Sequence, residues 1–166
     1  MFAALLDTSV LWPSLQRDFL LSLAIEGLYR PLWSSAILDD LQFHEARKLV
    51  ERGCAPEEAA RQSQRLIDQM STAFDDSSVE NWEPLNGTFG LPDPDDEHVV
   101  AAALVGRAQV IVTSNLKDFP PQRIPSHLPR PIRRRHRGCV PCCGAACRHD
   151  HVVPIHNSAT DRRTIR

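Results

Sequence analysis

Apolar positions along the first 113 residues follow two different spacings. Spacings of three and four residues, typical of amphipathic helices, occur over 14–28, 34–53, 55–74 and 95–107. Short runs with strand-like character lie between these segments, at 3–6, 29–33, 78–82 and 108–113. The five residues "DTSVL" that follow the first run are expected to form a loop. Because strands alternate with helices, the pattern predicts an α/β fold built around a mainly parallel sheet.

Polar side chains follow two of the predicted strands. Asp7 comes directly after the first one, and a second set follows the last one: Thr113, Ser114, Asn115 and Asp118. In open α/β sheets, ligands bind beyond the carboxyl ends of the strands. If both strands run in the same direction, the two polar clusters meet at one edge of the sheet.

The stretch "LPDPDDEHVVAAA" (91–103) places four carboxylates at the start of a predicted helix. Asp93 is a candidate N-cap with Pro94 at the first helical position, and acidic residues there complement the helix dipole. This explanation suits Asp95 and Glu97 better than Asp96. Asp96 heads the apolar stripe of its own helix, which continues through Val99, Val100, Ala103 and Leu104.

A carboxylate on the core side of a helix needs a partner, because an unpaired buried charge is costly. The nearest basic residues in the sequence are Arg107 and Lys117. A bound cation is the simplest alternative partner for Asp96.

Three segments, in this order, carry a resemblance to a known family: "LLDTSVL", "WSSAILDDL" and "LPDPDDEHVVAAALVGRAQVIVTSNLKDFP". Over residues 4–121 the chain resembles PIN-domain proteins, and within them the bacterial VapC-type toxins. The resemblance implies a three-layer α/β/α fold with a mainly parallel central sheet. It also implies a metal-dependent ribonuclease that belongs to a toxin–antitoxin system. The expected partners are an RNA substrate, a cognate antitoxin protein and a second copy of the chain.

The resemblance also assigns site residues. The expected catalytic carboxylates are Asp7, Asp40, Asp96 and Asp118, of which Asp7, Asp96 and Asp118 are the expected metal ligands. Thr113, Ser114 and Asn115 are expected to position the substrate, and Asn115 replaces the aspartate that often fills the family's fourth acidic position. Carboxylate oxygens of this kind suit Mg²⁺ or Mn²⁺.

Two residues are held in reserve. The family usually has glutamate where this chain has Asp40, which is one methylene shorter. Glu45 is the rival for this role, because its helical position lies nearer the apolar stripe formed by Leu41 and Leu49. Asp93 is the other reserve residue.

The aspartate at position 40 and the unusual C-terminal sequence leave an alternative open. The chain could be a catalytically impaired PIN fold that only binds RNA or an antitoxin. The rival interpretation of Asp7 as a phosphatase nucleophile is weaker, because "DTSVL" lacks the second aspartate that dehalogenase-like phosphatases carry two residues on.

Charge and cysteine usage change near residue 121. Residues 1–121 hold 9 Lys and Arg against 19 Asp and Glu, whereas residues 122–166 hold 10 Arg and 2 Asp. We therefore predict a PIN-like domain over 1–121 and a poorly ordered Arg-, Pro- and Cys-rich tail over 122–166. Within the tail, "RPIRRRHRG" (130–138) could bind RNA or form a disordered arm, and "CVPCCGAACRHDH" (139–151) could hold zinc.

The start of the chain lacks the basic n-region of a signal peptide, and no apolar run is long enough to span a bilayer. We expect a cytoplasmic protein without a membrane partner.

Overall fold

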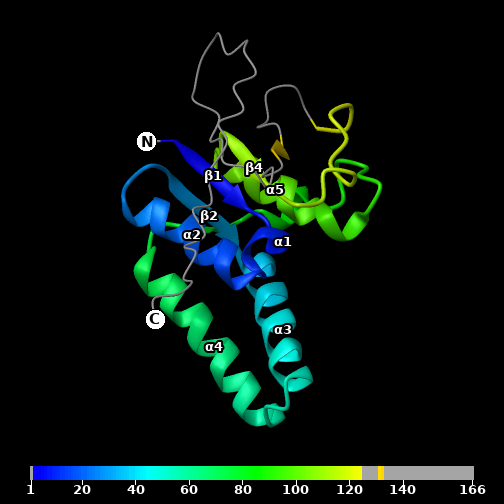
Figure 1. Ribbon diagram of the computed structural model, residues 1–166. Helices are drawn as coiled ribbons and strands as arrows, with labels where there is room; N and C mark the ends of the chain where they lie inside the picture. Colours follow the sequence, from blue (N-terminus) through cyan, green and yellow to red (C-terminus); the bar gives the residue numbers. More distant parts are fainter. Residues whose placement is uncertain (1, 125–130, 133–166) are drawn as a thin grey trace, which may run out of the picture. The chain divides into compact units, whose positions relative to one another are not determined.

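The computed structural model describes residues 2–124 and 131–132 and shows a central sheet of five parallel strands (Figure 1). The strands are β1 (Ala3–Leu6), β2 (Arg30–Ser34), β3 (Ser78–Val79), β4 (Val110–Val112) and β5 (Pro131–Ile132). Their order across the sheet is β3-β2-β1-β4-β5. All four neighbouring pairs are parallel, so the predicted α/β fold is confirmed.

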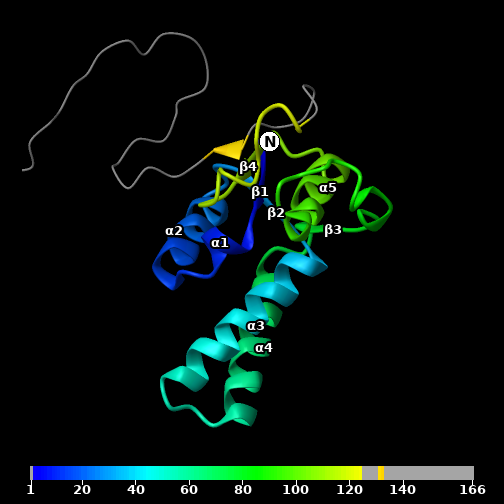
Figure 2. The same cartoon turned by 90° about the vertical axis from the view of Figure 1, so that its right-hand side faces the viewer.

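Helices cover both faces of the sheet. Helices α1 (Thr8–Leu11) and α2 (Ser14–Ile25) lie on one face, and α5 (Glu97–Val105) lies on the other (Figure 2). The central strand β1 is buried along its whole length, as a parallel strand between two helical layers should be. The chain thus has the three-layer α/β/α arrangement expected from its sequence.

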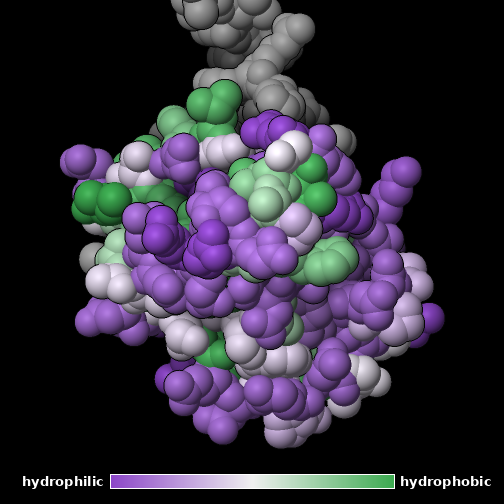
Figure 3. All heavy atoms as spheres, turned by 90° about the horizontal axis from the view of Figure 1, so that it is seen from below, coloured by the Kyte–Doolittle hydropathy of each residue, from purple (hydrophilic) through white to green (hydrophobic). Residues whose placement is uncertain are grey.

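Helices α3 (Ser35–Glu51) and α4 (Pro56–Ala73) run side by side and extend away from the sheet (Figures 1 and 2). Helix α4 buries Ala59, Ser63, Ile67 and Met70, which lie three or four residues apart. Its other faces are polar, and the surface seen from the end of this hairpin is mostly hydrophilic (Figure 3). The amphipathic spacing predicted for this segment is confirmed.

Two local predictions need correction. Residues of "DTSVL" form the short helix α1 and not a loop, because Trp12 N–H bonds Thr8 O and closes one turn. The helix predicted from residue 95 begins as a short 3₁₀ helix, η2 (Pro94–Asp96), and becomes α-helical only at Glu97. The capping prediction holds, since Asp93 accepts a hydrogen bond from the N–H of Asp95 and Pro94 occupies the first turn.

Helix α5 begins with Glu97 and His98 and is apolar from Val99 onward, and Val99–Ala103 are all buried. Small side chains let this helix approach the sheet closely. The turn after α5 is tighter still. A Cβ atom added at Gly106 would lie 2.7 Å from Val79 Cγ2, 3.0 Å from Ala102 O and 3.1 Å from Leu32 Cδ1.

Substituting Gly106 by alanine is therefore expected to lower the free energy of unfolding by about 1–3 kcal/mol, the usual cost of overpacking a core. The backbone at this residue lies in the right-handed helical region, so the effect is steric and not conformational. Urea unfolding followed by circular dichroism measures the change. An unfolding midpoint equal to that of the parent protein would show that the helix–sheet contact is looser than described.

Part of the predicted tail joins the sheet. Strand β5 pairs with β4 through Ile111 opposite Pro131 and Val112 opposite Ile132, so it covers that edge of β4. The domain boundary at residue 121 stays a prediction. The possible zinc-binding cysteines, and the basic run apart from the backbone of 131–132, lie outside the described residues. Within those residues, no helix combines the length and apolar character needed to cross a membrane.

Candidate active site

The residues that follow β1 and β4 meet at the carboxyl edge of the sheet, as the sequence predicts. The two strands are direct neighbours, and Asp7 N–H donates to Val112 O at 3.1 Å. Asp7 directly follows β1, and Thr113 directly follows β4. Parallel pairing therefore brings together two side chains that are 106 residues apart in the sequence.

Two hydroxyl groups hold the Asp7 carboxylate in one orientation. Ser9 Oγ donates to Asp7 Oδ2 at 2.5 Å, and Thr113 Oγ1 donates to the same oxygen at 2.7 Å. Asp7 is 6% exposed and Thr113 is fully buried. Such a buried and doubly hydrogen-bonded carboxylate is rigidly placed before any ligand arrives.

The same network orders the loop after β4. Ser114 N–H donates to Ser9 Oγ at 2.9 Å, and Asn115 N–H donates to Thr113 Oγ1 at 2.9 Å. The Asn115 amide donates to Asp118 Oδ2. Hydroxyl and amide groups thus connect this loop to Asp7 on one side and to Asp118 on the other.

Three carboxylates converge beside this network. Asp93, Asp96 and Asp118 each offer an oxygen, and these oxygens lie within 4.8 Å of one another. Asp93 directly precedes η2, Asp96 is its last residue, and Asp118 lies in the segment after β4. Among residues 2–124, no basic side chain forms an ion pair with any of the three.

The negative charge of Asp7 acts on this acidic group. Burial, followed by the negative charges of Asp7, Asp118 and Asp93 and a hydrogen bond with Asp118, raises the pKa of Asp96 to about 7. A carboxylate so perturbed is destabilised in its charged form until a cation arrives. Hard oxygen ligands without a basic partner fit a divalent ion such as Mg²⁺.

The raised pKa predicts that Asp96 destabilises the metal-free fold when it is charged. The folded-state pKa of about 7 lies above the ordinary value of 3.8, so the folded state holds a proton that the unfolded state releases. Stability is therefore lost as the pH rises from about 4 to about 7, and the loss is complete above the folded-state pKa. Asp96→Asn is expected to raise the melting temperature in the presence of a chelator, more at pH 8 than at pH 5.

Differential scanning calorimetry at both pH values measures this effect. Asp39→Asn, an exposed aspartate of α3, is the matched control and should change little. An equal effect of Asp96→Asn at both pH values would contradict the raised pKa.

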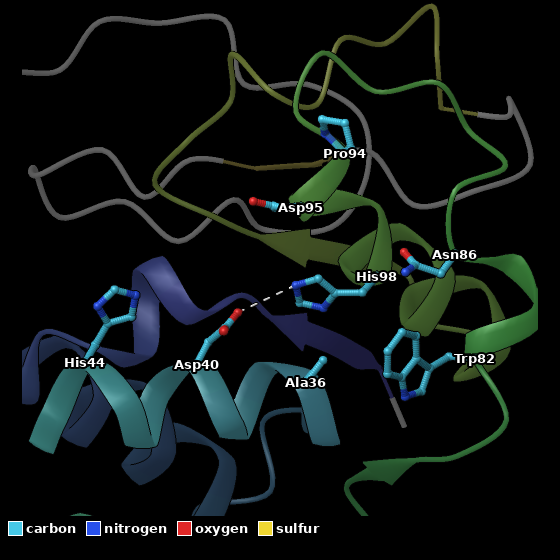
Figure 4. Close-up of a pocket in the computed structure, with 8 residues that line it drawn as sticks. All are labelled: Ala36, Asp40, His44, Trp82, Asn86, Pro94, Asp95 and His98. Carbon is cyan, nitrogen blue, oxygen red and sulfur yellow. Dashed lines mark ion pairs between the residues drawn. The ribbon is translucent and has the colours of Figure 1, made fainter.

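Asp40, the expected second acid, lies on α3 and is not part of the three-carboxylate group. Its side chain is 55% exposed, and its Oδ2 lies 3.7 Å from His98 Nε2 on α5 (Figure 4). Burial lowers the pKa of His98, although the nearby negative charges of Asp40, Asp7 and Asp95 oppose this shift. Asp40 therefore faces the start of α5 from across an open pocket.

Glu45, the reserve for that role, points elsewhere. It forms ion pairs with Lys48 one turn along α3 and with Arg17 of α2, whose Nη1 lies 3.9 Å away. Arg17 is buried and also donates to Leu11 O at 3.2 Å. In this structure Glu45 connects α2 to α3 and lies outside the three-carboxylate group.

Two arginines of the domain are paired with acids. Arg30 lies 3.6 Å from Asp76, and Arg47 lies 3.5 Å from Glu51. Lys117 is exposed beside the site.

Two further residues at this edge are not among the candidates that the sequence indicates. Ser9 is one, although its place two residues after Asp7 is a usable signal for a side-chain hydrogen bond. Glu97 is the other, since the sequence pattern explains it as a helix-start acid. It is in fact 3% exposed, and it accepts hydrogen bonds from the N–H groups of Phe89 and Leu91, each at 3.0 Å.

Comparison with known proteins supports one family. A family model described as "PIN domain" matches residues 3–117, well over half of the chain. Searches of curated proteins and of solved structures gave no significant match. The matched segment contains β1 and β4, the strands that position Asp7 and Thr113, together with Asp93 and Asp96. The chain belongs to the PIN-domain family.

Proposed function

We propose that the protein is a metal-dependent endoribonuclease that hydrolyses phosphodiester bonds in single-stranded or looped RNA. One observation carries the proposal. In a PIN-domain chain, Asp93, Asp96 and Asp118 bring their carboxylate oxygens within 4.8 Å of one another, and the charge of Asp7 acts on the same group.

Asp93, Asp96 and Asp118 would hold Mg²⁺ or Mn²⁺. Asp7, also an expected ligand, lies outside this group of three and acts on Asp96 through its negative charge. When bound, a divalent ion acts as a Lewis acid on a phosphate oxygen and makes water a better nucleophile at neutral pH. Asp93, the reserve residue of the sequence analysis, is included as a ligand because its carboxylate lies beside those of Asp96 and Asp118. It also caps η2 by accepting the Asp95 N–H.

The chain's own groups bind, orient and move protons. Asp7 or Asp96 accepts the proton that the attacking water loses. Ser9 and Thr113 keep Asp7 in place, and the amide of Asn115 orients Asp118. Asp40 contributes negative charge from α3 beside His98.

We further propose a toxin role in the VapC manner, with a cognate antitoxin protein, a homodimeric state and a cytoplasmic location. Several large apolar side chains are exposed and available to a protein partner: Leu15 (88%), Ile25 (69%), Leu28 (65%) and Phe43 (63%). A neighbouring reading frame for a small DNA-binding protein would support this assignment.

Metal removal tests the enzymatic part of the proposal. Purified full-length protein is expected to cleave a fluorescently labelled single-stranded RNA in the presence of Mg²⁺ or Mn²⁺. Cleavage should fall to background with excess chelator and return when the metal is restored. Cleavage that continues in chelator would refute metal dependence.

The alternative of an impaired PIN fold predicts a different result in the same assay. Such a protein would bind the RNA and leave it intact at every metal concentration. The convergence of Asp93, Asp96 and Asp118 favours the active enzyme over this alternative.

A further inference from the structure

His98 reaches from α5 towards Asp40, the expected catalytic acid that lies outside the three-carboxylate group. Its Nε2 atom lies 3.7 Å from Asp40 Oδ2, and this is the ion pair marked in Figure 4. The His98 side chain is 12% exposed, whereas the Asp40 side chain is 55% exposed. A nearly buried ring on one helix therefore faces an exposed carboxylate on another, and both side chains line the same open pocket.

The surroundings of the His98 ring leave it little freedom to turn. The ring lies beside the indole of Trp82, which directly precedes η1 (Glu83–Leu85), with centroids 6.0 Å apart and planes inclined by 58°. Trp82 is itself buried, and so are Val99 and Val100, which follow His98 in α5. Nδ1 of His98 is buried, and no residue in the described part of the chain forms a hydrogen bond with it. Nε2 is the nitrogen that faces Asp40.

Two arguments decide which nitrogen of the neutral ring carries the proton. With the proton on Nδ1, the ring would aim the Nε2 lone pair at a negative carboxylate and would bury an N–H group without an acceptor. With the proton on Nε2, an N–H group faces the carboxylate instead. The ring is neutral at pH 8, where an ordinary histidine is neutral too, and burial lowers the pKa of His98 further. The Nε2–H form is therefore favoured.

Asp40 has a firmly held backbone but a side chain with few restraints. Its neighbours on α3, Ile37 and Leu41, are fully buried, so the helix is anchored on both sides of Asp40. Within residues 2–124, no group donates a hydrogen bond to the Asp40 carboxylate, whereas Asp7 receives two from hydroxyl groups. The N–H edge of His98 is what gives this exposed carboxylate a preferred direction.

That direction leads towards the reaction site. His98 is the second residue of α5, and Asp96 ends the 3₁₀ helix that runs directly into α5. The negative charge of Asp7 also acts on His98. A carboxylate on α3 that is attracted to His98 is therefore attracted towards the acidic group.

We propose that His98 is a positioning residue, whose Nε2–H group orients the Asp40 carboxylate towards the acidic group for RNA cleavage. The proposal rests on the proposed function for the reaction in which Asp40 takes part. The distance of 3.7 Å is longer than a hydrogen bond. Contacts of this kind are often long in active sites without a ligand and shorten when the substrate binds. His98 acts through Asp40 and not on the substrate itself.

The NMR signals of the His98 ring test the contact without any cleavage. Full-length, isotope-labelled protein is observed at pH 8 in chelator, where the shifts of the two ring nitrogens distinguish the tautomers. We expect the Nε2–H form for His98, with a Nε2 signal that moves in Asp40→Ala. Asp39→Ala removes the neighbouring exposed carboxylate of α3 and is the control, which should leave that signal in place. A proton on Nδ1, or a His98 signal that ignores Asp40→Ala, would overturn the proposal.

Two substitutions of His98 separate the role of its N–H group from that of its bulk. A glutamine amide can reach the place of Nε2, whereas the shorter asparagine amide reaches only the place of Nδ1. His98→Asn is expected to lower the single-turnover rate of RNA cleavage at least about tenfold, as loss of such a supporting contact does. His98→Gln should keep most of the rate, and neither variant should change RNA affinity measured in chelator. Equal rates for the two variants, whether high or low, would contradict the proposal.

The Asp40→Ala background shows whether His98 acts through Asp40. In that background His98→Asn should cause no further loss of rate, because the carboxylate that His98 orients is gone. A further loss of the same size, or an Asp40→Ala protein as fast as the parent, would exclude the positioning role.

The two proposals can fail separately. If no RNA is cut but the His98 signal responds to Asp40→Ala as expected, the contact stands and the nuclease function falls. If RNA is cut in the presence of metal and His98→Asn cleaves at the parent rate, the nuclease stands and the positioning role is wrong.

Discussion

Replacing Asp96 by asparagine is expected to lower the rate of RNA cleavage by at least about a hundredfold, the lower end of the effect of removing a positioned catalytic group. Asp96 is the carboxylate whose pKa burial and the neighbouring acids Asp7, Asp93 and Asp118 raise. It shares the 4.8 Å group with Asp93 and Asp118, and the charge of Asp7 also contributes to raising its pKa to about 7. The asparagine side chain has nearly the same shape but carries no charge.

The measurement is a single-turnover cleavage assay at saturating Mn²⁺, with Asp39→Asn as the control. Because Asp96→Asn is expected to stabilise the metal-free fold, lost activity cannot be ascribed to unfolding. Cleavage by Asp96→Asn at the parent rate would remove the acidic group from the mechanism.

Replacing Glu97 by alanine is expected to lower the free energy of unfolding by about 3 kcal/mol, because two charge-assisted hydrogen bonds are lost and two N–H groups are left unpaired. The Glu97 carboxylate receives Phe89 N–H on one oxygen and Leu91 N–H on the other, and Leu91 is itself buried. Glu97→Gln keeps one acceptor oxygen, so it should fall between the parent and Glu97→Ala.

The pH dependence of this effect has a definite sign. Burial alone would raise the pKa of Glu97, but the backbone hydrogen bonds outweigh it and the pKa lies below its ordinary value of 4.5. The contribution of the ionised carboxylate is therefore present above pH 4.5 and is lost as the pH falls through the lowered pKa.

Chemical unfolding at pH 7 and at lower pH compares the parent with both variants, and Glu80→Ala serves as an exposed control. A gap between Glu97→Gln and the parent that widens on acidification would contradict this assignment.

Hydrophobic periodicity predicted those helices in which an apolar face is clearly distinct from a polar face. Helix α4 has a clear apolar stripe, and its predicted and observed bounds agree closely. The stripe that begins at Asp96 also indicated, correctly, that this carboxylate differs from its exposed neighbour Asp95. Helix α1 was not predicted, because a single turn is too short to show the helical spacing of apolar residues.

The remaining details of the site depend on contacts between distant segments. No pattern within residues 91–103 reveals that Glu97 folds back onto the preceding loop. Similarly, the choice between Asp40 and Glu45 depends on their neighbours. Glu45 forms an ion pair with Arg17 of α2, while Asp40 faces His98 of α5.

Location of the metal tests the central claim most directly. Crystals of the full chain soaked in Mn²⁺ and measured at the manganese absorption edge should show an anomalous peak between the carboxylates of Asp96 and Asp118. A well-diffracting, Mn²⁺-soaked crystal without a peak at that position, or with its peak at another part of the chain, would contradict the account.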